Sequence, residues 1–237
     1  RQRQMCIRDS KTTFRPHHAY RLVMTAMSVF QFVYLGAPSF GKQLVSHTDA
    51  EDGQFLVLHC LADMLHGSGH VEARDITDYK VQLMQENIER IGVINMSAAL
   101  QDATVFDPQS EEKADILLAD VPCSGLGVIG KKADIRYKMT PAKQAEIIKL
   151  QRKILDTVWK YVKVGGTLIY STCTIGAEEN QYNVKWFLEN YPFVLENMDP
   201  YICDELKGKT TEAGYLQLLP GVHKSDGFFI ARLKRIK

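Results

Sequence analysis

Apolar runs of strand length alternate with amphipathic helical segments along the chain from residue 61 onward. The runs at 71–75, 96–101, 114–121, 167–172, 194–198 and 227–233 have the length and composition of buried strands. Helical periodicity is found between them at 78–91, 140–164 and 178–189. Because regular alternation of strands and helices is typical of a parallel sheet covered by helices, the pattern predicts an α/β fold.

The first two of these helices have recognisable ends. Asp78 can cap the first, whose apolar positions recur at 3-4-3 spacing until Gly92 ends it. Thr140 caps the second, with Pro141 at its first position and Gly165-Gly166 at its end. The side chains that this second helix is expected to bury are Ile147, Leu150, Ile154, Val158 and Val162.

Two of the predicted strands end beside a cysteine. The run at 114–121 contains Asp120 and leads into Pro122, Cys123 and a glycine-rich turn, and the run at 167–172 leads into Cys173. The ends of two other strands carry carboxylates, Asp75 and Asp102. Ligands of open α/β sheets bind outside the carboxyl ends of the strands, so the fold could bring these groups to one crevice.

Composition limits the remaining possibilities. With 237 residues, 45% of them hydrophobic, the chain can form one sizeable globular domain. A net charge of +1 means that any contact with nucleic acid must be a local patch. Five cysteines without CxxC spacing and seven scattered histidines predict neither a disulfide framework nor a metal site. We expect a reducing, cytoplasmic location and no membrane span, since no stretch reaches the ~18 apolar residues required.

Five short segments together resemble the RsmB/NOP (Sun) family of RNA cytosine-C5 methyltransferases, and most of all its bacterial RsmB branch, which acts on 16S ribosomal RNA. They are Asp120-Val-Pro-Cys-Ser-Gly125, Ser171-Thr-Cys-Thr174, Glu178-Glu-Asn180, Leu219-Pro-Gly221 and Asp226-Gly-Phe-Phe229. The resemblance covers 61–237 and implies a methyltransferase catalytic domain there. It also implies a Rossmann-like class I fold that binds S-adenosylmethionine, with ribosomal RNA as the partner and a monomeric enzyme.

The resemblance also implies roles for individual residues. Cys173 would attack C6 of the cytosine, and Cys123 would help to release the methylated product. Both thiols could in principle attack, because DNA cytosine methyltransferases use a Pro-Cys cysteine like Cys123. Asp120 would bind the cytosine edge or assist protonation at N3, beside the cofactor. Asp75 would accept hydrogen bonds from ribose hydroxyls, and Asp102 would lie near the adenine.

A basic segment follows the Cys123 turn and is our candidate for RNA contact. Its charged side chains are Lys131, Lys132, Arg136 and Lys138.

Each of these sets of candidate residues, the cysteines and aspartates included, has a simpler interpretation as well. The cysteines could be buried core residues, the strand-end aspartates could cap turns, and the basic run could be a solvated face. Glu178 and Glu179 are interpreted as charges at a helix start, favoured there by the helix dipole.

The first 60 residues do not match the family. The opening decapeptide looks like a translated sequencing adapter, and an upstream frameshift would explain why the likeness begins abruptly. The family's first strand and Ala-Ala-Pro-Gly-Gly-Lys loop are missing, and residues 52–60 occupy their place in the sequence. The glycine-containing segment 36–42 lies too early in the chain to be that loop. We therefore expect a sheet without a normal first strand and glycine loop. The alternative function is a non-catalytic, RNA-binding remnant of such an enzyme.

Overall fold

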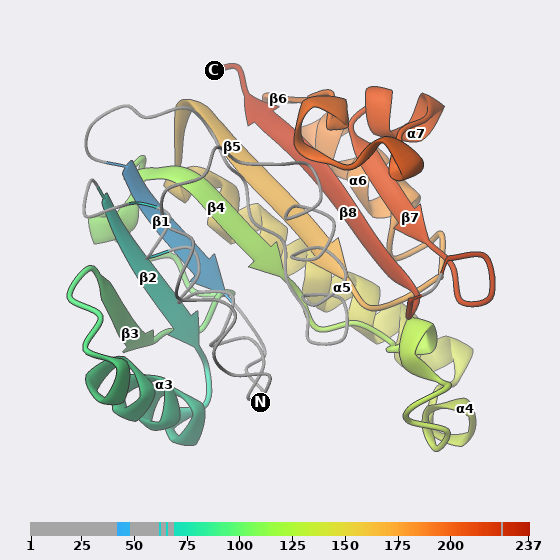
Figure 1. Cartoon of the computed structure of the whole chain (residues 1–237), viewed down its shortest axis with the longest axis horizontal. Helices are drawn as coiled ribbons and strands as arrows, with labels where there is room; N and C mark the ends of the chain where they lie inside the picture. The colour runs from blue at the N-terminus through green and yellow to red at the C-terminus, as the bar shows by residue number, and fades with distance from the viewer. Residues whose placement is uncertain (1–41, 48–61, 63–64, 66–68, 224) are drawn as a thin grey trace.

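The computed structural model describes residues 42–47, 62, 65, 69–223 and 225–237. Residues 52–60 and the expected position of the glycine-rich cofactor loop lie outside these residues. Within them the chain forms an α/β structure built on one eight-stranded sheet (Figure 1). The strand order is β3-β2-β1-β4-β5-β8-β6, and β7 pairs with β8.

The first five strands form a parallel block, and the last three pair antiparallel at one side. The strands are β1 Lys42–His47, β2 Gly69–Asp75, β3 Met96–Leu100, β4 Ala114–Asp120, β5 Val162–Thr172, β6 Phe193–Leu195, β7 Tyr215–Leu218 and β8 Phe228–Arg235. The α-helices are α3 Asp78–Ile91, α4 Ile135–Lys138, α5 Pro141–Val158, α6 Gln181–Asn190 and α7 Lys209–Glu212. Single 3-10 turns occur at Pro108–Ser110, Leu126–Val128, Trp159–Tyr161, Asp199–Tyr201 and Asp204–Leu206.

The centre of the sheet differs from the expectation that a normal first strand is missing. β1 fills the middle of the five-stranded parallel block, paired in parallel with β2 on one side and β4 on the other. The strand is formed by 42–47, upstream of the segment in which the family strand was sought. The order of connections reverses between β1 and β4, which is the switch point where ligands of doubly wound sheets bind.

The helices agree with the pattern in position but not in every boundary. Thr77, not Asp78, is the N-cap of α3, and Gly92 ends the helix in a left-handed conformation with φ of 74°. α5 begins as predicted, with Thr140 as N-cap and Pro141 first, but it ends at Val158. Val162 therefore belongs to β5 and not to the helix.

Three clusters of buried side chains hold the layers together. The largest packs α5 and α6 on one face of β4, β5 and β8, through residues such as Leu155, Phe187 and Phe229 (Figure 1). α3 covers β2 and β3 through Val81 and Met84. The third cluster lies on the opposite face, around β7 and the turns before it. Leu150, expected in the core, is 41% exposed on the outer side of α5.

Candidate active site

The tips of β4 and β5 bring the predicted catalytic residues together. The two strands are parallel neighbours, and Asp120 pairs in register with Ser171. The Ser171 hydroxyl donates a hydrogen bond of 3.0 Å to Asp120 Oδ1, and both side chains are buried. Because side chains alternate along a strand, Asp120 and Ser171 lie on the face of the sheet opposite to α5.

The two predicted catalytic thiols are in direct contact. Cys123 Sγ and Cys173 Sγ are 2.7 Å apart, and the backbone N–H of Cys173 donates to Cys123 Sγ at 3.2 Å. Both cysteines are half-buried and free of disulfide bonds. The sulfurs are 50 positions apart in the sequence and meet only because their strands end at the same edge. The predicted convergence of the two cysteine motifs is confirmed.

The environment of Cys173 disfavours its thiolate form. Its pKa is raised above the ordinary thiol value, first by the hydrogen bond with Cys123, then by burial, and then by the charges of Cys123 and Asp120. Since the thiolate is the nucleophilic form, Cys173 is kept protonated until something changes these surroundings.

The raised pKa predicts how fast Cys173 reacts with iodoacetamide. The thiolate fraction falls about tenfold for each pH unit below the pKa, so alkylation should be slow at neutral pH and accelerate in alkali. In Cys123→Ala the largest cause of the shift is removed, and the rate profile of Cys173 should move to lower pH. Mass spectrometry of the modified peptides measures this, with Cys203 as an internal control whose profile stays fixed. A shift to higher pH would contradict the assigned cause.

The proposed cofactor carboxylates end neighbouring strands. Asp75 is the last residue of β2 and Asp102 follows β3, and these strands are parallel. Both make the turn contacts that the simpler interpretation anticipates: Asp75 Oδ1 accepts from the Thr77 N–H at 2.7 Å, and Asp102 Oδ1 accepts from the Thr104 N–H at 2.8 Å. Asp75 also lies 3.7 Å from Lys80 Nζ. Turn capping holds each carboxylate at the edge where the switch point lies.

The predicted RNA-contacting segment forms an exposed arm at the same end of the sheet as the tips of β4 and β5 (Figure 1). The second half of this segment is the short helix α4. Lys131 Nζ pairs with Asp226 Oδ2 at 2.5 Å, which ties the arm to the turn before β8, and Lys138 pairs with Asp134. Arg136 is exposed on the same helix. All four predicted basic residues face solvent.

Two glycines allow the loops around the thiols to touch through their backbones. The Gly127 N–H donates to the Cys173 carbonyl at 3.0 Å, and the Gly227 N–H donates to the Gly127 carbonyl at 2.8 Å. A Cβ on Gly127 would collide with the Gly227 carbonyl and come within 2.7 Å of the Cys173 carbonyl oxygen. Gly127 is not among the predicted site residues, although glycine in a loop after a strand is a signal of close backbone approach.

One carboxylate near the site differs from its predicted role. The sequence predicts Glu179 to be a charge at a helix start, but its side chain is fully buried and α6 begins two residues later. Glu179 Oε2 accepts a 2.9 Å hydrogen bond from the N–H of Ser124, next to Cys123. The Ser124 hydroxyl in turn lies 2.8 Å from Thr174 Oγ1, next to Cys173. The two cysteine loops are thus linked through side chains as well as backbone.

A family profile decides the classification. The profile described as 16S rRNA methyltransferase RsmB/F matches residues 58–234. The chain belongs to the RsmB/F family. The match covers the two cysteine loops, the carboxylates at the strand ends and the Glu179 segment. It begins at residue 58, close to residue 61, where the resemblance in the sequence begins.

Relatives agree with the RsmB/F assignment. Ribosomal RNA small subunit methyltransferase F from Cronobacter sakazakii is 34% identical over 176 residues, 74% of this chain and 37% of that protein. The crystal structure of NSun6 from Pyrococcus horikoshii with SFG is 28% identical, with a TM-score of 0.64 over 82% of this chain and 48% of that one. A methyltransferase homologue from the same organism has a TM-score of 0.66 and 24% identity, covering 84% of this chain and 63% of that one, and this likeness shows a shared fold. The chain thus spans just over a third of the length of its curated relatives.

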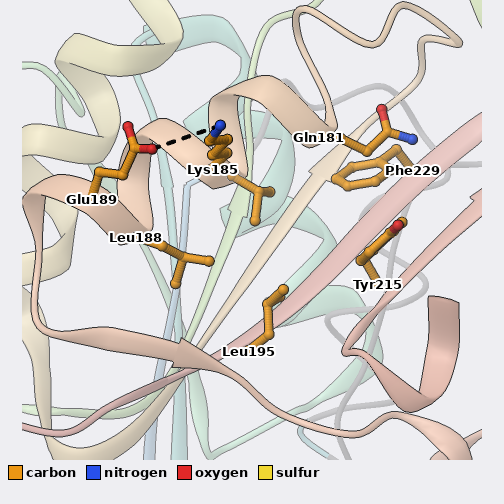
Figure 2. A pocket seen from close by; sticks show the side chains of 8 residues that line it. Gln181, Lys185, Leu188, Glu189, Leu195, Tyr215 and Phe229 are labelled. Carbon is orange, nitrogen blue, oxygen red and sulfur yellow. Dashed lines mark ion pairs between the residues drawn. The ribbon is translucent and has the colours of Figure 1, made fainter. Parts of the chain in front are cut away.

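Neither cysteine of the pair lines the pocket in Figure 2. The pocket has a volume of about 320 Å³ and opens between α6 and strands β6, β7 and β8. Its lining residues are Gln181, Val184, Lys185, Leu188, Glu189, Leu195, Tyr215 and Phe229. None of the predicted site residues lines it, so it is separate from the candidate active site. In the part of the chain that the structure describes, no His, Cys, Asp or Glu cluster could hold a metal ion, and no helix could cross a membrane.

Proposed function

We propose that residues 61–237 form a catalytic domain that transfers a methyl group from S-adenosylmethionine to C5 of a cytosine in small-subunit ribosomal RNA. Membership of the RsmB/F family supports the reaction class and the RNA. The observation that carries the proposal is the contact between Cys123 and Cys173, 2.7 Å apart beside Asp120. We expect the enzyme to work as a monomer in the cytoplasm, where ribosomal RNA is modified and thiols stay reduced.

Two thiols and a carboxylate suit the chemistry of cytosine C5, which is a poor nucleophile. Cys173, once it has lost its proton to solvent, attacks C6, and Asp120, which first takes up a proton in the closed site, gives that proton to N3, so that C5 gains enamine character. C5 then takes the methyl group that the bound cofactor would supply, and the methyl–sulfur bond of the cofactor would break to leave S-adenosylhomocysteine. The Cys123 sulfur, as thiolate, removes the C5 proton, the C5–C6 double bond re-forms, Cys173 leaves as thiolate, and the N3 proton returns to Asp120.

The cofactor site is proposed at the ends of β2, β3 and β4. When bound, S-adenosylmethionine supplies the methyl group. Asp75 would accept hydrogen bonds from the ribose hydroxyls, Asp102 would lie near the adenine, and Asp120 would border both the cofactor and the cytosine. Carboxylates at the ends of neighbouring parallel strands fit these polar groups. The related NSun6 structure contains SFG, an analogue of S-adenosylmethionine, which supports the choice of cofactor.

A methylation assay of the purified chain tests the proposal. Small-subunit ribosomal RNA and S-adenosylmethionine labelled in its methyl group are the substrates, and nucleosides are identified by mass spectrometry after digestion. We expect 5-methylcytidine. Methylation at another atom would overturn the C5 assignment. RNA binding without methyl transfer, together with no calorimetric binding of S-adenosylmethionine, would establish the non-catalytic remnant instead.

The basic arm is proposed to hold RNA phosphates beside the target base, which must leave its stack to reach the thiols. Because each phosphate contact releases counterions, Arg136→Ala should weaken RNA binding and reduce the slope of log affinity against log salt by about 1. Fluorescence anisotropy at several salt concentrations measures this. Lys185→Ala, on α6, is the matched control and should leave the slope unchanged. An unchanged slope in Arg136→Ala would remove this residue from the RNA contact.

A further inference from the structure

Two adjacent side chains, Glu179 and Asn180, are fully buried next to the cysteine loops, Glu179 in contact with α5 and Asn180 in contact with β7. Their neighbour Glu178 is exposed. A buried carboxylate without hydrogen-bond partners is strongly unfavourable, so the contacts of Glu179 explain why it can be accommodated there. Neither residue touches the reacting atoms in the proposed mechanism, and each hydrogen-bonds to a different cysteine loop.

Glu179 holds the Cys123 loop. Its Oε2 accepts hydrogen bonds from the Ser124 N–H at 2.9 Å and from Gln151 Nε2 at 3.1 Å, and its Oε1 accepts from Gln144 Nε2 at 3.1 Å. The same Gln151 Nε2 donates to the Pro122 carbonyl at 2.9 Å. The peptide groups on both sides of Cys123 are therefore fixed by one buried network that contains Glu179.

Asn180 holds the Cys173 loop in the same way. Its Nδ2 donates to the Thr174 carbonyl at 3.0 Å, and its Oδ1 accepts from the Thr172 hydroxyl at 2.6 Å. The residues on both sides of Cys173 are thus held by a single amide. Gln217 Oε1 accepts a second hydrogen bond from Asn180 Nδ2 at 2.7 Å, which orients the amide.

We infer that Glu179 and Asn180 are a pair of positioning residues, Glu179 for the release function of Cys123 and Asn180 for the attack by Cys173. Since the two residues are joined by one peptide bond, they fix the two cysteine loops relative to each other. The kinetic consequences of this inference rest on the proposed function. The placement of the two thiols relative to each other can be tested without any catalytic activity.

Isosteric variants separate the two roles. Glu179→Gln replaces one acceptor oxygen by a donor that faces other donors, and Asn180→Asp replaces the donor to the Thr174 carbonyl by an acceptor. The free energy lost with a buried hydrogen bond to a charged group corresponds to a change of about ten- to hundredfold in a rate constant. We expect Glu179→Gln to slow release of the RNA adduct by about that factor while its formation changes little. Asn180→Asp should slow adduct formation by a similar factor. The control, Glu178→Gln, should change neither rate.

Single-turnover kinetics, with adduct measured on denaturing gels and product by mass spectrometry, give the two rates, and thermal denaturation checks the fold. Equal loss of both rates in both variants, in step with a lower Tm, would reduce the pair to a structural role and overturn the inference. So would unchanged rates in both. If the unaltered chain forms no adduct, the rate at which diamide oxidises Cys123 and Cys173 to a disulfide still tests the geometry. Slower disulfide formation in Glu179→Gln and Asn180→Asp, but not in Glu178→Gln, supports the positioning role. Equal rates of disulfide formation in all three variants overturn the inference.

Discussion

Cys173→Ala is expected to abolish methyl transfer and adduct formation together, whereas Cys123→Ala is expected to leave RNA covalently attached to the protein. The first variant lacks the sulfur that bonds to C6, and removal of a covalent nucleophile lowers turnover by on the order of 10⁴ or more. The second keeps that sulfur but lacks the group that takes the C5 proton, so the reaction stops after methyl transfer. A denaturing gel with labelled RNA shows the trapped species, and mass spectrometry shows whether its cytosine carries the methyl group.

Cys203→Ala is the control for both variants, because Cys203 is a buried free cysteine that contacts neither thiol of the pair. It should turn over normally. The reverse result, an adduct in Cys173→Ala and none in Cys123→Ala, would exchange the two roles, which is the alternative that the Pro-Cys motif leaves open. An adduct in neither variant, with cofactor and RNA bound, would contradict the covalent mechanism.

The parallel half of the sheet could be predicted from the sequence because buried parallel strands are continuous apolar runs. The runs at 71–75, 96–101 and 114–121 became β2, β3 and β4 with boundaries within two residues. β5 was predicted too short, since Val162 continues the spacing of the preceding helix and Gly165-Gly166 looks like a helix stop. In the structure these glycines lie inside the strand. β7 was missed because its four residues, Tyr215–Leu218, are too few to establish a period.

The cysteine pair could also be predicted, for a topological reason. Once β4 and β5 are neighbours in a parallel sheet, residues that follow both strands must meet at one edge, whatever connects them. The groups that fix the thiols could not be predicted in this way. Gln151 and Glu179 are 28 positions apart and meet through the packing of α5 against the start of α6, for which no local pattern exists. Glu179 and the exposed Glu178 are adjacent and have nearly the same sequence context, so the sequence does not show which of the two is buried.

Gly127→Ala is expected to lower methyl transfer more than any other variant except the substitutions of the two cysteines, although it adds only one methyl group. That methyl would occupy the space of the Gly227 carbonyl and crowd the Cys173 carbonyl, and backbone atoms cannot rotate away as a side chain can. Overpacking of this kind costs about 1–3 kcal/mol or more. The strain can be relieved only by moving the Cys123 loop away from β8 and the Cys173 loop, which would separate the thiols.

We therefore expect methyl transfer by Gly127→Ala to fall by at least about a hundredfold, as misplacement of reacting groups by about 1 Å can do. Urea denaturation should show the accompanying loss of stability. Gly130→Ala is a matched control on the same loop, because a Cβ at Gly130 would meet nothing within 4 Å. It should retain activity and stability. If Gly127→Ala were as active as Gly130→Ala, the close backbone contact between the loops would not set the distance between the thiols. The side-chain links between the loops, from Ser124 to Thr174 and through Glu179 and Asn180, would then be sufficient for activity.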